Sequence, residues 1–303
     1  MNGTHPLCHI CKTQSVFFMN KDGFDEYVCP SCKLSFVFPQ PSAEELKEKV
    51  YSYESGYQGN KKPDLSSVPE EKKRVETMDL LSKRKPNGKL LDVGCSSGGF
   101  MFSARKRGFS CEGVEINKRT ADIATANGFE VFQGFLENAP FNKESFDVIN
   151  LGDIIEHVND PRFLLKTCAG LLKPNGIIVI STPNVDCFWS KATLWLYRVF
   201  NIPWASATPP HHLFQFNFEN LNRLLAEQGF ENTHQIFSRP RSLKYELGSL
   251  HLLKKWKSDK TAGNLLYMLF AFSIYSGLYG LNVVFKPFLR KDFQMVVFYE
   301  RNQ

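Results

Sequence analysis

The stretch "LLDVGCSSGGFM", residues 90–101, decides the fold of this 303-residue chain. Its apolar start predicts a buried β-strand, and the small residues that follow predict a tight turn into a helix. Asp92 stands two residues before Gly94, and Ser96 occupies a position where a nicotinamide-binding G-x-G-x-x-G loop needs glycine. A carboxylate at this place would repel a pyrophosphate. The loop therefore favours a ligand that lacks phosphate and carries a positive end.

Strand and helix patterns alternate from residue 70 onward. Strands are predicted at residues 89–95, 110–116, 129–134, 145–152 and 176–182, with helical segments between most of them. Such alternation is typical of an α/β fold with a doubly wound, mostly parallel sheet, in which ligands bind beyond the carboxyl ends of the strands. Glu115 ends the second strand 21 positions after Gly94, about where a dinucleotide fold places the acid that binds both ribose hydroxyls.

This combination resembles the class I S-adenosylmethionine-dependent methyltransferases over residues 70 to about 240 and the final strand. The resemblance implies a methyltransferase Rossmann-like sheet of seven strands. It also implies that Asp92 helps to hold the methionine end of the cofactor, directly or through water, and that Glu115 binds its ribose. The loop residues expected to wrap the cofactor are Gly94, Ser96 and Gly98.

The expected adenine site lies after the third strand of this core. The family usually carries an acidic residue there, whereas this chain has Phe135 and Leu136. Adenine contacts are therefore expected from apolar packing and from the backbone. Leu151, at the end of the fourth strand, completes the expected cofactor site.

Four cysteines near the N-terminus form two Cys-x2-Cys pairs separated by 17 residues: Cys8, Cys11, Cys29 and Cys32. This spacing indicates a tetrahedral Zn²⁺ site, and the residues between the pairs predict two short strands around a turn at Asp22 and Gly23. The result is a zinc ribbon whose folding depends on the metal. A closed four-thiolate site favours a structural role, although a grip on substrate or on a partner stays open. The stretch "MNGTHPLCHICK" lacks the apolar core of a secretory signal, so we expect thiols or metal ligands rather than disulfides.

The stretch "NLGDIIEHVNDP" after the fourth strand carries the second group of candidate residues. Asp153, Glu156 and His157 stand at i, i+3 and i+4, a spacing that predicts one face of a helical turn. The same spacing also fits a helix-capping box. The stretch resembles the motif that follows this strand in ubiquinone-type O-methyltransferases. Its Asp-x-x-Glu-His spacing is similar to the divalent-metal site of these enzymes and of small-RNA 2′-O-methyltransferases, which take a further histidine from downstream.

That resemblance implies a divalent-ion site, with Mg²⁺ or another divalent metal, whose expected ligands are Asp153, Glu156, His157 and His211. His157 and His212 are the candidate catalytic bases, and a general base without metal is an equal alternative. A purely structural role is the third. The first carboxylate departs from the family pattern, because these families favour glutamate where Asp153 stands.

The expected domains are a zinc ribbon at 1–40, a helical linker at 41–75, the cofactor-binding core at 76–240, an apolar helical insertion at 241–290 and the final core strand at 291–303. Residues 261–285 carry no charge and are long enough to span a bilayer. A single crossing would separate the last two strands, so two helices that break near Ser276 and Gly277 or at Gly280 are expected. They form either a buried cap or dimer face, or a peripheral membrane contact flanked by basic residues.

The chain is thus expected to be a cytoplasmic methyltransferase, with peripheral contact at the inner membrane face as an option. Its acceptor is a small or lipid-linked molecule, with oxygen favoured as the methylated atom. The ribbon and "LSFVFPQPSAEELKEKVY" after it resemble bacterial ribbon-bearing methyltransferases, including those that methylate sugars at carbon. RNA methylation and a non-catalytic adaptor are the alternatives, but the net charge of +6 comes without a dense basic run, so nucleic acid is not the expected partner.

Overall fold

A computed structural model describes residues 5–42, 44–46, 65, 70–202, 204, 206–238, 243, 247, 252–285 and 292–301. The chain divides into two compact units. The first contains residues 1–182, 209–236 and 296–303, and the second contains residues 183–208 and 237–295. The expected linker at 41–75 lies mostly outside the described residues.

A seven-stranded sheet forms the centre of the first unit, in the order β10-β11-β8-β7-β4-β5-β6. Its strands are β4 (Lys89–Val93), β5 (Ser110–Glu115), β6 (Glu130–Gln133), β7 (Phe146–Gly152), β8 (Leu172–Pro183), β10 (Phe230–Ser238) and β11 (Gln294–Arg301). The pairs β4–β5, β4–β7, β5–β6 and β7–β8 are parallel. The strand order changes direction at β4, which has β5 on one side and β7 on the other. The doubly wound α/β fold expected from the alternation is confirmed.

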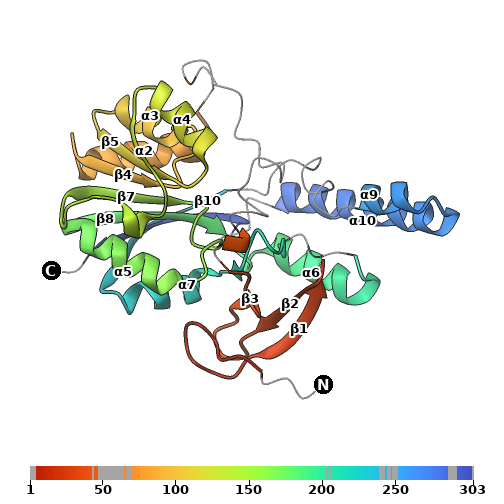
Figure 1. Ribbon diagram of the computed structural model, residues 1–303. Helices are drawn as coiled ribbons and strands as arrows, with labels where there is room; N and C mark the ends of the chain where they lie inside the picture. The colour runs from red at the N-terminus through yellow and green to blue at the C-terminus, as the bar shows by residue number, and fades with distance from the viewer. Residues whose placement is uncertain are drawn as a thin grey trace. The chain divides into compact units, whose positions relative to one another are not determined.

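Helices cover both faces of this sheet, with α2, α3 and α4 on one face and α5 and α7 on the other (Figure 1). Their bounds are α2 (Lys72–Arg84), α3 (Gly99–Arg105), α4 (Lys118–Ala126), α5 (Pro161–Leu171) and α7 (Phe218–Ala226), with a 3-10 turn η2 at Leu136–Asn138. Apolar side chains of α2, β4, β7 and β8 meet in one core cluster that includes Met78, Leu90 and Val148. Helices α3 and α7 are each followed within three residues by a glycine with positive φ, Gly108 and Gly229.

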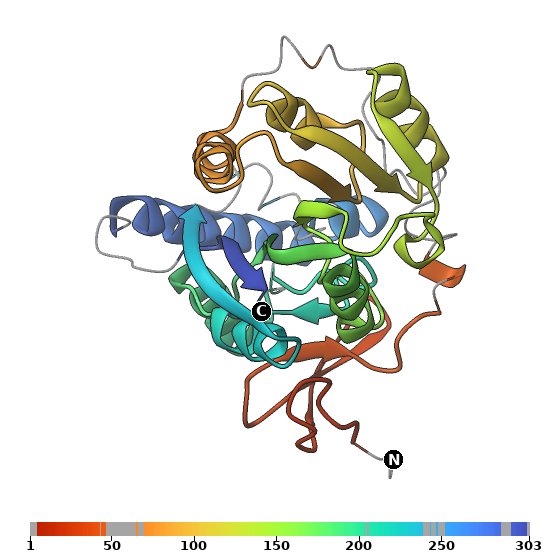
Figure 2. The same cartoon turned by 90° about the vertical axis from the view of Figure 1, so that its left-hand side faces the viewer.

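The N-terminal ribbon, red in Figure 2, contains β1 (Val16–Lys21), β2 (Phe24–Val28) and β3 (Ser35–Val37). The turn between β1 and β2 has Asp22 and Gly23 at φ 52° and 87°, the left-handed conformations that a two-residue hairpin requires. A fourth strand, β9 (Phe214–Gln215), comes from the core and pairs antiparallel with β3, with Phe36 opposite Phe214. The ribbon and the core therefore share one small sheet.

Core side chains also bind the backbone of the ribbon. Arg162, in the first turn of α5, donates to the carbonyl oxygens of His9 and Ile10 at 3.1 and 2.7 Å. Asn220 of α7 donates to the carbonyl oxygen of Cys32 at 3.5 Å. Both Cys-x2-Cys turns are thus attached to helices of the core.

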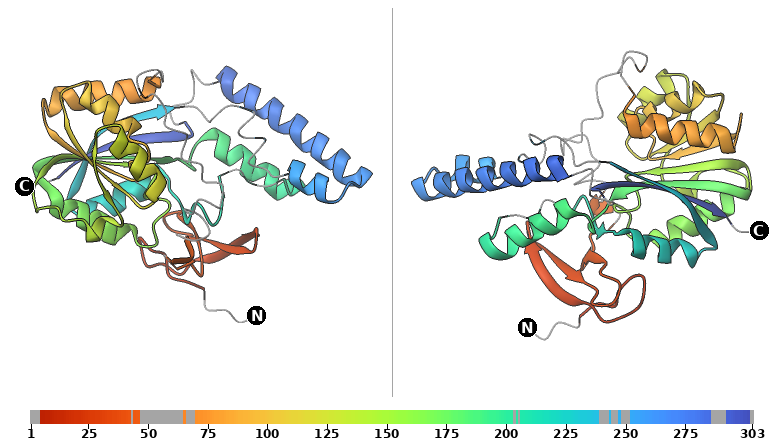
Figure 3. Two further views of the ribbon diagram at one scale, coloured as in Figure 1. Left: turned by 45° about the horizontal axis from the view of Figure 1, so that its top comes forward. Right: turned by 180° about the vertical axis from the view of Figure 1, so that it is seen from behind.

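The second unit is helical and contains α6 (Phe188–Phe200), α9 (Leu252–Ser258) and α10 (Ala262–Phe285). Figure 3 shows α6 and α10 as long neighbouring helices. Trp189 of α6 packs edge to face on Tyr275 and Tyr279 of α10, at centroid distances of 5.2 and 5.7 Å. The expectation of two helices that break near Ser276 and Gly277 or at Gly280 is wrong, because α10 is continuous from Ala262 to Phe285. Glycine inside a helix costs only about 1 kcal/mol, which this packing offsets.

Candidate functional site

Asp92 lies near the carboxyl end of β4 and is buried, with 2% of its surface exposed. Asn150, its register partner on β7, donates from Nδ2 to Oδ1 of Asp92 at 2.7 Å. Burial raises the pKa of Asp92 to about 7, while Asn150 and the charge of Arg74 act in the opposite direction. A carboxyl in this state gains from any cation that approaches it, because the cation compensates for the lost hydration.

Glu115 ends β5, the strand beside β4, and its negative charge contributes to the raised pKa of Asp92. The two acids therefore lie within electrostatic reach of each other, at neighbouring strand ends. The backbone N–H groups of Ser96 and Asn117 each donate to one carboxylate oxygen of Glu115 at 2.8 Å. The side chain of Thr120 and the N–H of Ile116 also favour the charged form of this carboxylate. Burial raises the pKa of Glu115, and these backbone bonds oppose the shift.

The loop between β4 and α3 folds tightly against its neighbours. Gly94, Ser96 and Gly98 have φ of 72°, 49° and 88°, in the left-handed region. A Cβ on Gly94 would lie 2.2 Å from Cδ1 of Ile154, and one on Gly98 would lie 2.9 Å from Phe129. Glycine is therefore needed at both positions for steric as well as conformational reasons.

The residues predicted to contact an adenine lie near this loop and the acids. Gly134 donates its N–H to the carbonyl oxygen of Glu115 at 3.0 Å, which holds the start of the next segment beside β5. Phe135 is 37% exposed, whereas Leu136 in η2 and Leu151 in β7 are buried. Phe135 is the member of this set with surface available to a planar ligand.

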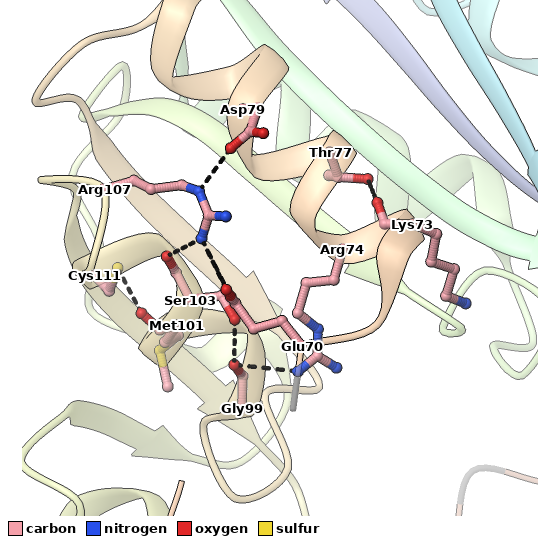
Figure 4. A network of polar contacts seen from close by, with 10 residues as sticks. All are labelled: Glu70, Lys73, Arg74, Thr77, Asp79, Gly99, Met101, Ser103, Arg107 and Cys111. Carbon is pink, nitrogen blue, oxygen red and sulfur yellow. Dashed lines mark hydrogen bonds and ion pairs between the residues drawn. The ribbon is translucent and has the colours of Figure 1, made fainter. Parts of the chain in front are cut away.

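Helix α2 is fastened beside the same loop (Figure 4). Arg74 donates to the carbonyl oxygen of Gly99, the first residue of α3, at 3.4 Å. Arg107 pairs with Glu70 and Asp79 at 3.2 and 3.0 Å and so ties the end of α3 to the α2 segment. Sequence reasoning missed Arg74 and Asn150, because neither belongs to a local motif. The strand order alone would have indicated Asn150.

The Asp153 to His157 stretch does not form the expected helical face. It consists of turns, and the helix begins only at Pro161, where Asp160 caps its N-terminus. Asp153 has φ 54° and accepts a hydrogen bond from Ser181 Oγ at 3.0 Å, so its carboxylate is directed to the end of β8. The helical prediction is wrong because the spacing of acids at i and i+3 cannot distinguish a helix from successive turns.

Three of the candidate side chains nevertheless come together. Ligand atoms of Glu156, His157 and His212 all lie within 4.8 Å of one another. The rings of His157 and His212 meet edge to face, with centroids 4.8 Å apart. Among the described residues, Asp153 does not belong to this cluster. His211 contacts Nδ1 of His157 through its backbone carbonyl oxygen and not through its ring.

That carbonyl contact determines the tautomer of His157. A carbonyl oxygen only accepts, so Nδ1 carries the proton and Nε2 keeps its lone pair. Burial lowers the pKa of His157, which favours the neutral ring near pH 7. Nε2 of His157 can thus accept a proton or bind a metal ion.

The four ribbon thiols form a second group with metal-site geometry. Their Sγ atoms all lie within 4.8 Å of one another, with 3.5 Å between Cys8 and Cys32 and 3.3 Å between Cys11 and Cys29. Backbone N–H groups of Ile10 and Cys32 point at the sulfurs of Cys8 and Cys29 at 3.4 Å. Such N–H···S contacts stabilise thiolates. Four thiolates in this arrangement fit one tetrahedral Zn²⁺.

Comparisons with known proteins agree with this geometry. A ubiquinone biosynthesis O-methyltransferase from Actinobacillus pleuropneumoniae is 32% identical over 117 residues, which cover 34% of this chain and 50% of that protein. The enzyme of the same name from Pasteurella multocida is 35% identical over 112 residues, covering 32% and 46%. The matched region spans about half the length of these curated relatives.

Two solved structures share the fold at low identity. A phosphoethanolamine N-methyltransferase from Haemonchus contortus, solved with S-adenosyl-L-methionine, has a TM-score of 0.54 at 16% identity and covers 89% of this chain and 62% of that one. The YcgJ protein from Bacillus subtilis has a TM-score of 0.50 at 13% identity and covers 76% and 99%. A methyltransferase domain family matches residues 70–235, which is more than half of the chain. The protein therefore belongs to this methyltransferase domain family, and its core has the class I methyltransferase fold.

Proposed function

We propose that the protein transfers a methyl group from S-adenosylmethionine to an oxygen of a small or lipid-linked acceptor in the cytoplasm. The observation that carries the proposal is the pair of buried carboxylates, Asp92 and Glu115, at neighbouring strand ends beside the glycine loop. Oxygen is favoured because the curated relatives are named as O-methyltransferases. Methylation of a sugar carbon is the alternative within the same chemistry.

Each carboxylate has its own part in holding the cofactor. Asp92, oriented by Asn150, binds the ammonium group of the methionine end, where the positive charge offsets the cost of the buried acid. Glu115, oriented by the N–H groups of Ser96 and Asn117, accepts hydrogen bonds from the ribose hydroxyls. Gly94 and Gly98 keep the loop close enough to wrap the ligand. Phe135, which is partly exposed, packs on the adenine, and the buried Leu136 and Leu151 complete the apolar part of this proposed site.

The bound cofactor supplies a methyl group on a sulfonium, which is already a good leaving group. The remaining work of the chain is to position the acceptor, to exclude water and to remove a proton. His157 removes that proton with Nε2, because its Nδ1–H is held by the carbonyl oxygen of His211. His212, whose ring packs on His157, fixes the orientation of the imidazole.

The same cluster supports a divalent ion as the alternative to a free base. Glu156, His157 and His212 offer one carboxylate and two imidazoles within 4.8 Å, a mixed set that suits Mn²⁺, Fe²⁺ or Zn²⁺ better than Mg²⁺. An ion held there would lower the pKa of an acceptor hydroxyl. In the ribbon, Cys8, Cys11, Cys29 and Cys32 would hold a structural Zn²⁺.

Isothermal titration with S-adenosylmethionine and with its demethylated product tests the cofactor site. We expect Asp92→Asn and Glu115→Gln to weaken binding by roughly a hundredfold each, because each loses about 2–3 kcal/mol of charge-assisted bonding. Glu112→Gln is the matched control for Glu115, since Glu112 lies on the same strand and pairs with Lys89 at 2.5 Å. Asp122→Asn, on the exposed surface of α4, is the control for Asp92.

Equal binding by all four variants would overturn the proposed site.

A separate titration with Mn²⁺ tests whether the Glu156, His157 and His212 cluster binds a divalent ion. Binding is followed by electron paramagnetic resonance in the native protein and in His212→Gln. Loss of a bound-Mn²⁺ signal in that variant supports the divalent-ion alternative. No bound signal in the native protein leaves His157 as a metal-free base.

A further inference from the structure

Helix α10 is apolar on every side, yet its own unit covers only one stripe of it. The helix has no charged residue over Ala262–Phe285 and is long and apolar enough to cross a membrane. Its buried residues are Met268, Ala271, Tyr275 and Asn282. Only 22% of its most apolar stretch is buried, whereas the core helix of a globular domain would be mostly buried.

The uncovered side of α10 carries large hydrophobic residues along its whole length. These are Leu266, Leu269, Phe270, Leu281, Val284 and Phe285, with exposed fractions of 68, 50, 43, 50, 67 and 50%. Small residues, Ser273, Gly277 and Gly280, fill the exposed positions between them. No charged residue interrupts the stripe, so contact of this side with water is unfavourable.

The stripe continues onto the neighbouring helix α6. Trp195 and Val199 of α6 are 56 and 52% exposed. Trp195 packs edge to face on Phe200, with ring centroids 5.8 Å apart. Phe200 packs in turn on Phe270 of α10, with ring centroids 5.3 Å apart. We call the exposed residues of α10 together with Trp195 and Val199 the apolar surface. It is a continuous feature of the second unit, not a set of scattered residues.

Basic residues flank α10 in the sequence, and two of them are exposed in the described part of the chain. Lys257 and Lys260 are exposed immediately before α10. The sequence has Lys254 and Lys255 before them and Lys286, Arg290 and Lys291 after the helix, against the acids Asp259 and Asp292.

This charge distribution distinguishes a lipid surface from a second copy of the chain. Two copies that met through the apolar surface would bring like basic edges close together, which is unfavourable. Anionic headgroups would instead be attracted, at about 1 kcal/mol per basic residue near the surface.

The sheet topology excludes a simple crossing of the membrane by α10. The chain leaves the core sheet after β10 and returns to it at β11, and these two strands are neighbours. A single crossing would place them on opposite sides of the bilayer. Helix α9 has seven residues and is about 10 Å long, too short to cross back. A membrane contact of helix α10, about 36 Å long, would therefore place it along the surface and not across the bilayer.

We propose that the apolar surface of α6 and α10 binds the headgroup and acyl boundary of an anionic membrane leaflet, with α10 parallel to the membrane plane. Such in-plane helices bury their apolar side about 5–10 Å into the interface. Lys257 and Lys260, which are exposed just before α10, would then reach the anionic headgroups. This binding does not depend on methyl transfer and would concentrate the enzyme where a lipid-linked acceptor is found.

Co-sedimentation of the full chain with vesicles tests the proposal. Vesicles of equal parts phosphatidylglycerol and phosphatidylcholine are compared with phosphatidylcholine alone, at low and at high salt. At low salt, we expect the native protein to bind the anionic vesicles at least about tenfold more strongly than vesicles of phosphatidylcholine alone. The double variant Leu266→Glu with Phe270→Glu should lose about tenfold or more of this binding, because both charges would enter the apolar boundary.

Phe163→Glu is the matched control, since Phe163 of α5 is an equally exposed aromatic, at 51%, in the other unit. Its vesicle binding should equal that of the native protein. Calorimetric binding of S-adenosylmethionine by each variant verifies that the core remains folded and separates this test from that of the cofactor site. The proposal is overturned if the native protein does not bind anionic vesicles. It is also overturned if the double variant and Phe163→Glu lose vesicle binding equally. Sedimentation velocity that shows a dimer, dissolved by the double variant, without vesicle binding would identify the surface as a contact between copies.

Discussion

At Asp92, stability and ligand binding act in opposite directions. Burial raises the pKa of its carboxyl to about 7, whereas in the unfolded chain the group titrates near pH ~4. Between these values the folded protein binds the extra proton, so the free energy of unfolding falls as the pH rises from about 4 to 7 and is level above. We expect Asp92→Asn at about pH 8 to raise the free energy of unfolding by roughly 2–4 kcal/mol, at about 1.4 kcal/mol per pKa unit. Denaturant titration measures this gain, and a loss of stability would contradict it.

His157 allows a second prediction at the scale of one residue. Its pKa is lowered by burial, so the folded protein binds fewer protons than the unfolded chain just below pH ~6.5. The stability contributed by the neutral ring is therefore present above about pH 6.5 and is lost as the pH falls below it. Nitrogen-15 NMR of the imidazoles should show a neutral ring with the proton on Nδ1 at neutral pH, in a signal that is absent from His157→Gln. A proton on Nε2 instead would remove the proposed base.

Single residues differ in how far the sequence could place them. Asp92 and Glu115 were predictable as neighbours, because a local pattern puts each at the end of a strand and parallel strands end at one edge. Asn150 was not, since its bond to Asp92 depends on which strand lies beside β4. The roles of His211 and His212 were also beyond reach. Adjacent histidines look alike in sequence, but one meets His157 through its backbone and the other through its ring.

Among the elements, the strands and helices of the core were predicted well because hydrophobic period and glycine stops act locally. Strand β9 was not predictable, since it has two residues and exists only by pairing with β3, far away in sequence. The continuous α10 was missed for a related reason. Gly277 and Gly280 lower helix propensity locally, while the contacts of Tyr275 and Tyr279 with Trp189 that hold the helix are non-local.

The shared ribbon sheet predicts that the proposed zinc site affects the Glu156, His157 and His212 cluster but not the cofactor residues. The N–H groups of Leu213 and Phe214, at the start of β9, donate to the carbonyl oxygen of Glu156 at 2.8 and 3.2 Å. Loss of the ribbon should therefore loosen the Glu156, His157 and His212 cluster. We expect Cys11→Ser to remove bound zinc and to lower the hydrogen-exchange protection of the Phe214 amide by at least about tenfold, because metal binding and ribbon folding are coupled.

The affinity for S-adenosylmethionine should change less than about twofold in Cys11→Ser, since Asp92 and Glu115 lie on strands that make no pair with the ribbon. Cys111→Ser is the control, because Cys111 is a lone thiol of the core that hydrogen bonds to the carbonyl oxygens of Met101 and Phe109. It should retain zinc and full protection. Unchanged protection of Phe214 in zinc-free protein would show that β9 does not depend on the ribbon.

For the whole molecule, the division into two units predicts two unfolding transitions. Each unit has its own hydrophobic cluster, one built around Met78 and Val148 and the other around Trp189 and Tyr275. The proposed cofactor residues all belong to the first unit. In differential scanning calorimetry, the demethylated cofactor at about a hundred times its Kd should stabilise that unit by about 2.7 kcal/mol and raise one transition. The second transition should stay in place with the cofactor and move instead with anionic vesicles. One transition that shifts as a whole with either ligand would mean that the units unfold together, because ligand binding to one would then stabilise both.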